Sequence, residues 1–257
     1  MVMSAHTNPS GNRNAGLTLI ELLVALALSA LLLMGLVQIA TAASSSTQLQ
    51  RNQARIQEHA RMASKVLSAA VRQAGFNPQP WSAEFPAAGL VELSVDGVSR
   101  AGDRLAVRYW SDLNCFENRN PDVDEAGNPL FYIRESVFDM NTTQSLTYQC
   151  RYGPSISELT TQIRRQGFIN EVESFQVLYG VDPGGEAGIE AWVKAGQWTD
   201  PAAVVGVRIG LLLVSTDAVV TPTAQRFDVL DATINRGADG KLRRVIDFSV
   251  AIKGKSG

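Results

Sequence analysis

The feature that most constrains this chain is a long apolar stretch near its N-terminus. Sixteen residues pass without a charge from Leu22 to Val37, and the apolar character continues to Ala43. As a helix, residues 17–43 would extend about 40 Å, more than the roughly 30 Å of a membrane's hydrocarbon core. The sequence therefore predicts a membrane-spanning helix over 17–43. The alternative is a cleaved signal peptide, although this stretch is longer than the usual apolar region of such a peptide.

One acidic residue, Glu21, lies inside this stretch and is the only charged residue between positions 17 and 43. An acid at the centre of a membrane helix costs roughly 2.5 to 3.5 kcal/mol, and less near an end, so it is expected to have a partner. Cleavage between Gly16 and Leu17 would create an α-amino group within one helical turn of Glu21, on the same chain or on a neighbour packed in parallel. The ammonium group and the carboxylate would then neutralise each other.

The sequence around this position resembles the type IV prepilin motif. Residues 15–25 read AGLTLIELLVA, in which glycine is followed by an apolar residue, Thr-Leu-Ile-Glu and a long apolar run. The resemblance implies that an inner-membrane prepilin peptidase cleaves after Gly16 and methylates Leu17. It also implies that Glu21 acts in subunit assembly.

The orientation implied by this motif opposes a simple count of positive charges. Arg13 precedes the apolar stretch, whereas Arg51, Arg55 and Arg61 follow it, and the more basic side usually stays in the cytoplasm. We give more weight to the leader motif, which implies a cytoplasmic N-terminus, and to two cysteines that fit an oxidising exterior. We therefore expect a single-pass protein of the bacterial inner membrane, with its C-terminal part in the periplasm until it joins the pilus.

The next segment has the pattern of an amphipathic helix. From Leu49 to Ala74, apolar residues recur with spacings of 7, 4, 3, 4, 3 and 4. Gly75, followed by Pro78, is typical of a helix end. One helix is therefore predicted over 17–76. The basic residues of its second half indicate either a solvated face or a contact with acidic head groups or a neighbouring subunit.

Beyond Pro80, runs of β-branched and aromatic residues alternate with turn sequences. This pattern predicts an α+β fold in which an antiparallel sheet packs on the helix. The expected domains are a leader (1–16), a membrane half of the helix (17–43), an amphipathic half (44–76) and a β-rich periplasmic head (77–257). Strands are expected over 103–110, 130–136, 145–151, 172–181, 204–215, 225–235 and 243–252.

Two cysteines, Cys115 and Cys150, enclose 36 residues of the head, counting both. In an oxidising compartment, two thiols in a small domain usually pair. A disulfide is therefore favoured over two buried free thiols.

Several weaker signals in the head resemble, by their order, the PilW family of minor pilins. The resemblance implies a non-enzymatic, low-abundance subunit that joins other minor pilins in a priming complex at the filament tip, and whose partners include minor and major pilins. The residues that carry it are Cys115, Leu146-x-Tyr148-x-Cys150, Phe175-x-Val177-x-Tyr179-Gly180-x-Asp182, Trp198, Val205-x-Val207-Arg208-Ile209-x-Leu211-Leu212 and Leu242-Arg243-Arg244-Val245.

Two other functions remain open from the sequence. A minor pseudopilin of a type II secretion system would carry the same N-terminal motif. The head could instead be a ligand-binding module at the tip, an adhesin or a DNA receptor, with loops 111–129 and 182–200 as its surface.

Composition argues against catalysis and cofactor binding. His6 and His59 are the only histidines, so neither a Ser-His-Asp triad nor a zinc site finds enough candidates. The acidic turn at 122–128 lacks the ligand pattern of a calcium loop. A net charge of −2, without basic segments interleaved with aromatic residues, gives no indication of nucleic-acid binding. We therefore expect no enzymatic activity, metal, cofactor or small-molecule substrate.

Overall fold

The computed structural model describes residues 18–82, 85, 93–99, 102–185 and 188–252. The chain divides into two compact units, with the boundary between Gln48 and Leu49. Helix α1 (Leu19–Gln73) contributes to both units and agrees with the predicted helix to within three residues at each end. Gly75, with φ of +71°, follows its end, as expected for a glycine that terminates a helix.

In the first unit, the described residues present their apolar side chains outward. The large apolar side chains from Leu19 to Ile39 are between 52% and 79% exposed. The segment is long and apolar enough to cross a membrane. A helix that is apolar on all sides requires an apolar environment, so these residues fit a membrane anchor.

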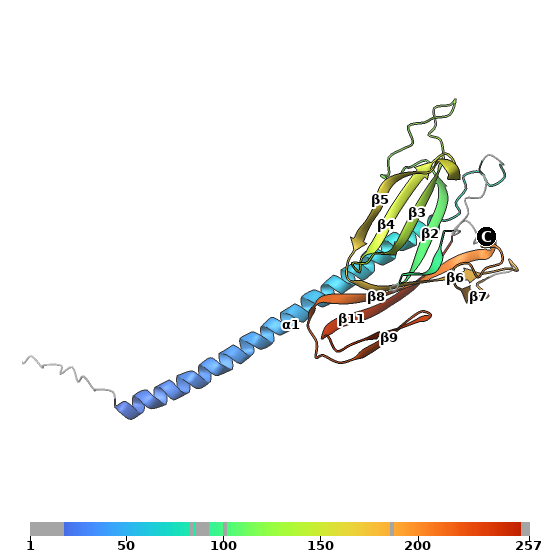
Figure 1. The fold of residues 1–257 in the computed structure, drawn as a ribbon. Coiled ribbons are helices and arrows are strands. Elements are labelled where there is room, and N and C mark those ends of the chain that lie inside the picture. The colour runs from blue at the N-terminus through green and yellow to red at the C-terminus, as the bar shows by residue number, and fades with distance from the viewer. Residues whose placement is uncertain (1–17, 83–84, 86–92, 100–101, 186–187, 253–257) are drawn as a thin grey trace, which may run out of the picture. The chain divides into compact units, whose positions relative to one another are not determined.

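The second unit combines the C-terminal part of α1 with a sheet of nine strands and a separate β-hairpin (Figure 1). The strands are β1 (Val95–Ser99), β2 (Gly102–Ser111), β3 (Tyr132–Met140), β4 (Leu146–Gly153), β5 (Thr160–Ile169), β6 (Val172–Val181), β7 (Ala191–Val193), β8 (Val204–Ala218), β9 (Gln225–Val229), β10 (Ala232–Arg236) and β11 (Lys241–Ala251), with the short 3-10 helices η1 (Ile156–Glu158) and η2 (Pro201–Ala203). The order of the main sheet is β11-β8-β6-β2-β3-β4-β5, with β1 added to β2 and β7 added to β6. The pairing is antiparallel except between β2 and β6.

The core of this unit lies between the amphipathic part of α1 and one face of the sheet. The predicted apolar stripe of the helix is the buried one: Ile56, Ala63 and Leu67 are at most 2% exposed. They belong to one cluster with apolar side chains from both halves of the sheet. The α+β prediction is therefore confirmed. The strand side chains of this cluster include Leu105, Val107, Phe138, Leu146, Phe175, Val177, Val207, Ile209 and Leu211.

The predicted strand over 225–235 is wrong, because this segment forms the hairpin β9–β10. Leu230 has φ of +53° and begins the turn, a backbone conformation that a strand does not contain. Three strands, β1, β5 and β7, were not predicted. Strand β5 is polar and mostly exposed because it lies at the edge of the sheet, so its sequence lacks apolar alternation.

The two halves of the main sheet meet at one close backbone contact. Strand β2 pairs in parallel with β6 at Gly102 and Phe175. Gly102 has φ of +153°, and a Cβ atom at this position would lie 1.9 Å from the carbonyl oxygen of Phe175. Only glycine fits this junction without a shift of the backbone.

Gly102→Ala is therefore expected to destabilise the head by about 2 to 3 kcal/mol, since it combines a backbone clash with an unfavourable φ. The measurement is chemical unfolding of the full chain in detergent. Gly127→Ala is the matched control, because Gly127 has φ of +82° but open space around its Cβ position. We expect this control to cost about 1 kcal/mol; equal losses from both variants would refute the assigned clash.

Candidate functional site: the N-terminal end of the apolar helix

The first turn of α1 is closed by reciprocal hydrogen bonds between Thr18 and Glu21. The backbone N–H of Glu21 donates to Oγ1 of Thr18 over 3.3 Å. In return, the backbone N–H and the hydroxyl of Thr18 both donate to Oε2 of Glu21, each over 3.1 Å. This is a capping box, in which a threonine before the helix and a glutamate three residues later satisfy each other's backbone N–H groups.

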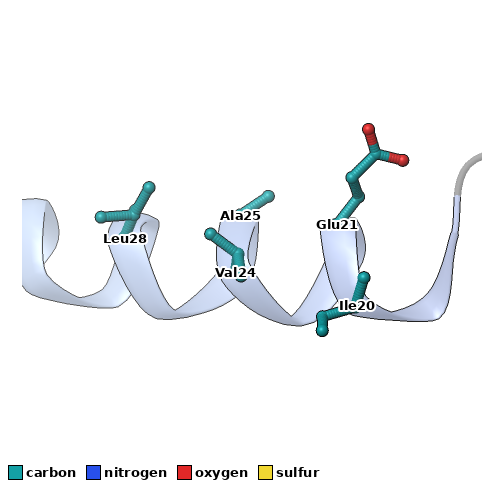
Figure 2. Close-up of a pocket in the computed structure, with 5 residues that line it drawn as sticks. All are labelled: Ile20, Glu21, Val24, Ala25 and Leu28. Carbon is teal, nitrogen blue, oxygen red and sulfur yellow. The ribbon is translucent and has the colours of Figure 1, made fainter.

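The capping box uses only one oxygen of the Glu21 carboxylate. Among the residues that the structure describes, Oε1 accepts no hydrogen bond, and the side chain is exposed. Figure 2 shows the carboxylate pointing away from the helix, beside the apolar side chains of Val24, Ala25 and Leu28. With Ile20 they line a shallow hollow of about 300 Å³ along the helix. Within residues 18–48, the site therefore presents one anionic oxygen that accepts no hydrogen bond, on an apolar surface.

The predicted cleavage and methylation positions, Gly16 and Leu17, lie outside the described residues. The structure therefore describes only Glu21 of the three predicted N-terminal site residues. The prediction did not include Thr18 as a site residue. Its signal was present in the sequence, because Thr-x-x-Glu at the start of an apolar helix is the pattern of a capping box.

The predicted disulfide between Cys115 and Cys150 is present in the structure. It ties the β2–β3 loop to strand β4, and both sulfur-bearing residues are buried. Two further contacts fix the same end of the loop: Glu117 pairs with Arg134 over 2.7 Å, and the N–H of Cys115 donates to Gln162 over 2.9 Å. The loop is thus attached to three strands of the sheet.

The acidic turn at 122–128 uses its carboxylates for its own backbone. Asp124 accepts hydrogen bonds from the N–H groups of Ala126 and Asn128, and these bonds lower the pKa of its carboxyl group. Asp122 accepts a hydrogen bond from the hydroxyl of Tyr132 over 2.6 Å. Across the described ranges, no group of three or more His, Cys, Asp or Glu residues is placed to hold a metal ion.

The two loops of the alternative ligand surface, 111–129 and 182–200, have different neighbours. The loop at 111–129 is attached to β3, β4 and β5, as described above. In the loop at 182–200, Lys194 pairs with Asp231 over 2.6 Å and with Asp96 over 3.5 Å, and so faces the β9–β10 turn and β1.

Two buried acids in the head are balanced by arginines. Glu135 is completely buried and bonds to Arg108 and Arg151, each over 2.6 Å. Glu173 bonds to Arg236 and Arg243. Burial acts to raise the pKa of Glu173, but the two arginines lower it overall. These networks tie strands together, and each of the two carboxylates is paired with two arginines.

Comparisons with known proteins identify both ends of the chain. The model of the prokaryotic N-terminal methylation motif matches residues 11–37, which include the capping box. The model of type IV pilus-assembly protein W, the PilW family, matches residues 130–253, which include β3 to β11. No curated protein matches the chain.

Among solved structures, the chain is similar to a type IV-like pilin from Thermus thermophilus. The sequence identity is 16% and the TM-score 0.48, and the match covers 79% of this chain and all of that one. The methylation motif at the start of an apolar helix is that of a membrane-anchored pilin. Because this motif and the PilW head occur in one chain, the protein is a type IV minor pilin and belongs to the PilW family.

Proposed function

We propose that this minor pilin primes pilus assembly as part of a tip complex with other minor pilins. Before assembly, α1 holds it in the inner membrane and the head lies in the periplasm. The prepilin peptidase cleaves after Gly16 and methylates Leu17. The subunit then packs its helix in parallel with those of neighbouring minor and major pilins. In this function it acts as a structural subunit without catalytic activity.

The observation that carries this proposal is that only one of the two carboxylate oxygens of Glu21 takes part in capping the helix. Cleavage after Gly16 would place a positively charged α-amino group at the end of α1, where the apolar surface offers it no other anion between residues 18 and 48. Oε2 caps its own helix, so Oε1 is available to an α-amino group of a neighbouring subunit. A charge-assisted hydrogen bond in an apolar environment is stronger than one in water. When two such helices pack in parallel, the α-amino group of one subunit and the Glu21 carboxylate of its neighbour lie at similar depths in the membrane.

The head supports the proposed compartment. The Cys115–Cys150 disulfide requires an oxidising environment, which the periplasm provides and the bacterial cytoplasm does not. The two buried sulfur atoms lie in a cluster with Tyr132, Tyr152 and Ile163. The head is therefore expected to reach its stable form only after export.

Deletion of the gene in the host bacterium, followed by complementation, tests the proposed function. We expect the deletion to remove most surface pili and twitching motility, and the wild-type gene to restore both. The chain should also be found in sheared pili at a small fraction of the amount of the major pilin. Normal piliation together with a loss of protein secretion would refute the proposal and identify a pseudopilin of type II secretion instead.

A further inference from the structure

A buried carboxylate, that of Asp103, lies where the two halves of the head sheet meet. Asp103 follows Gly102 on β2 and is 2% exposed. Its Oδ2 accepts the backbone N–H of Val177 on β6 over 2.8 Å, and its Oδ1 accepts the backbone N–H of Gly97 on β1, also over 2.8 Å. One side chain therefore links three strands.

The hydrogen bond from Val177 to Asp103 replaces a backbone hydrogen bond that the pairing of β2 and β6 does not provide. Strands β2 and β6 pair at Gly102 and Phe175 and then diverge, so Val177, two residues further along β6, has no backbone acceptor on β2. Val177 is 2% exposed, and a buried N–H without an acceptor costs about 1 to 3 kcal/mol. The carboxylate of Asp103 supplies that acceptor.

The bond to β1 holds the middle of a weakly paired strand. β1 pairs with β2 through Val95 and Ser99, and the register is irregular between these residues. Gly97 lies in that interval with φ of +69° and is exposed. The hydrogen bond to Oδ1 of Asp103 thus holds β1 at a position where regular backbone pairing with β2 is interrupted.

The surroundings of Asp103 favour protonation of its carboxylate. None of its contacts with described residues is to Lys, Arg or His. The titratable groups that act on it are Asp96 on β1 and Asp231 in the β9–β10 turn. On β6, burial and to a lesser extent the charge of Asp103 raise the pKa of the Tyr179 phenol. Lys194 pairs with both Asp96 and Asp231 rather than with Asp103.

We infer that Asp103 is a proton-operated latch for β1. The ionised carboxylate holds the N–H groups of both Val177 and Gly97. A protonated carboxyl group keeps one full acceptor and turns its other oxygen into a donor, so it can hold only one of them. Val177 is buried, whereas Gly97 can turn to water, and the proton therefore goes to Oδ1. Mild acid therefore releases the N–H of Gly97 and loosens β1 there, while the carboxyl group of Asp103 stays buried.

The pH range in which the latch opens is set by opposing influences on the pKa of the Asp103 carboxyl group. Burial raises the pKa of Asp103, the two N–H bonds lower it, and Asp96 and Asp231 raise it again, with a result of about 6. The pKa of Asp103 in the folded chain is therefore above its ordinary value of 3.8. A raised pKa means that the folded state binds the proton more tightly than the unfolded chain. The contribution of this group to stability is fully present below about pH 4 and is lost as the pH rises through about 6.

The latch thus predicts two effects of opposite sign. Between about pH 7.5 and about pH 5, acidification should increase the free energy of unfolding through Asp103, while it loosens β1 locally. Ordinary acid unfolding would weaken both together. This difference separates the latch from a general loss of structure.

Hydrogen–deuterium exchange of the full chain in detergent tests the latch at about pH 7.5 and about pH 5, with rates divided by the intrinsic rate at each pH. We expect the protection of Gly97 in β1 to fall about threefold to tenfold at the lower pH, the value of one hydrogen bond. The amide of Val177 should keep its protection. Equal protection of Gly97 at both pH values, or a loss at Val177 instead, would overturn the inference.

Asp103→Asn and Asp231→Asn separate the latch from other acidic groups. Asparagine offers one acceptor and one donor, so Asp103→Asn should show the exchange of acidified wild type at both pH values. Asp231→Asn leaves both N–H bonds in place and removes a like charge, so the release of β1 should shift to lower pH even if Asp103→Asn does not fold. Asp247→Asn, at an exposed carboxylate paired with Arg208, is the control and should behave as wild type. A release of β1 with an unchanged midpoint in Asp231→Asn would contradict the latch.

Discussion

Replacing Glu21 by glutamine is expected to reduce incorporation of the chain into pili by about tenfold to a hundredfold, without removing it from the membrane. Glutamine at this position still accepts the hydrogen bonds of Thr18, because a capping box works with either residue. What is lost is the negative charge on Oε1, and a charge-assisted hydrogen bond contributes about 1.5 to 3 kcal/mol. The measurement is the ratio of this chain to the major pilin in sheared pili, by quantitative immunoblot.

Two variants of the same helix separate the charge from the cap. Thr18→Ala removes the cap and retains the charge, so it should cost about 1 kcal/mol of helix stability and reduce incorporation only several-fold. Ser29→Ala removes a hydroxyl that donates within the helix to the carbonyl of Ala25, and should have no effect on incorporation. If Thr18→Ala were as defective as Glu21→Gln, capping rather than charge would be the function of Glu21.

The second large effect is expected from removal of the disulfide. Cys115→Ser combined with Cys150→Ser should lower the free energy of unfolding of the head by about 3 to 4 kcal/mol, from the loop entropy of a sequence separation of 35. The loss also frees the β2–β3 loop from β4. Urea unfolding of the full chain in detergent, with and without reductant, measures this effect.

A second pair of substitutions separates the bond from the environment of its atoms. Serine hydroxyls would be buried in a cluster of aromatic and apolar side chains, whereas Cys115→Ala with Cys150→Ala adds no polar group. Both double variants should unfold at a lower urea concentration than oxidised wild type, and reduced wild type should resemble the alanine pair. A wild-type midpoint that does not respond to reductant would contradict the assigned role of the bond.

The sequence predicted elements best where apolar periodicity is complete. The helix was predicted because its stripe, including Ile56, Ala63 and Leu67, is also the face that the sheet buries. β6 was predicted at its observed bounds because it lies inside the sheet. Edge strands such as β5 were missed, since an exposed strand needs no apolar alternation.

The site was predictable as far as it depends on adjacent residues. The lone acid of the apolar stretch identified Glu21, and the pattern Thr-x-x-Glu was available for its cap. The junction at Gly102 and Asp103 could not be predicted, because the residues that explain it, Phe175 and Val177, are more than 70 positions away. Only the topology brings β2 and β6 together.

The whole account depends on a cation at the end of α1, which only cleavage after Gly16 supplies. The most direct test is the mass of the N-terminal peptide of the chain isolated from host membranes. We predict that it begins at Leu17 and carries one methyl group on its α-amino nitrogen. A mature chain that still begins at Met1 or Val2, or one that is cut beyond Ala43, would contradict the account.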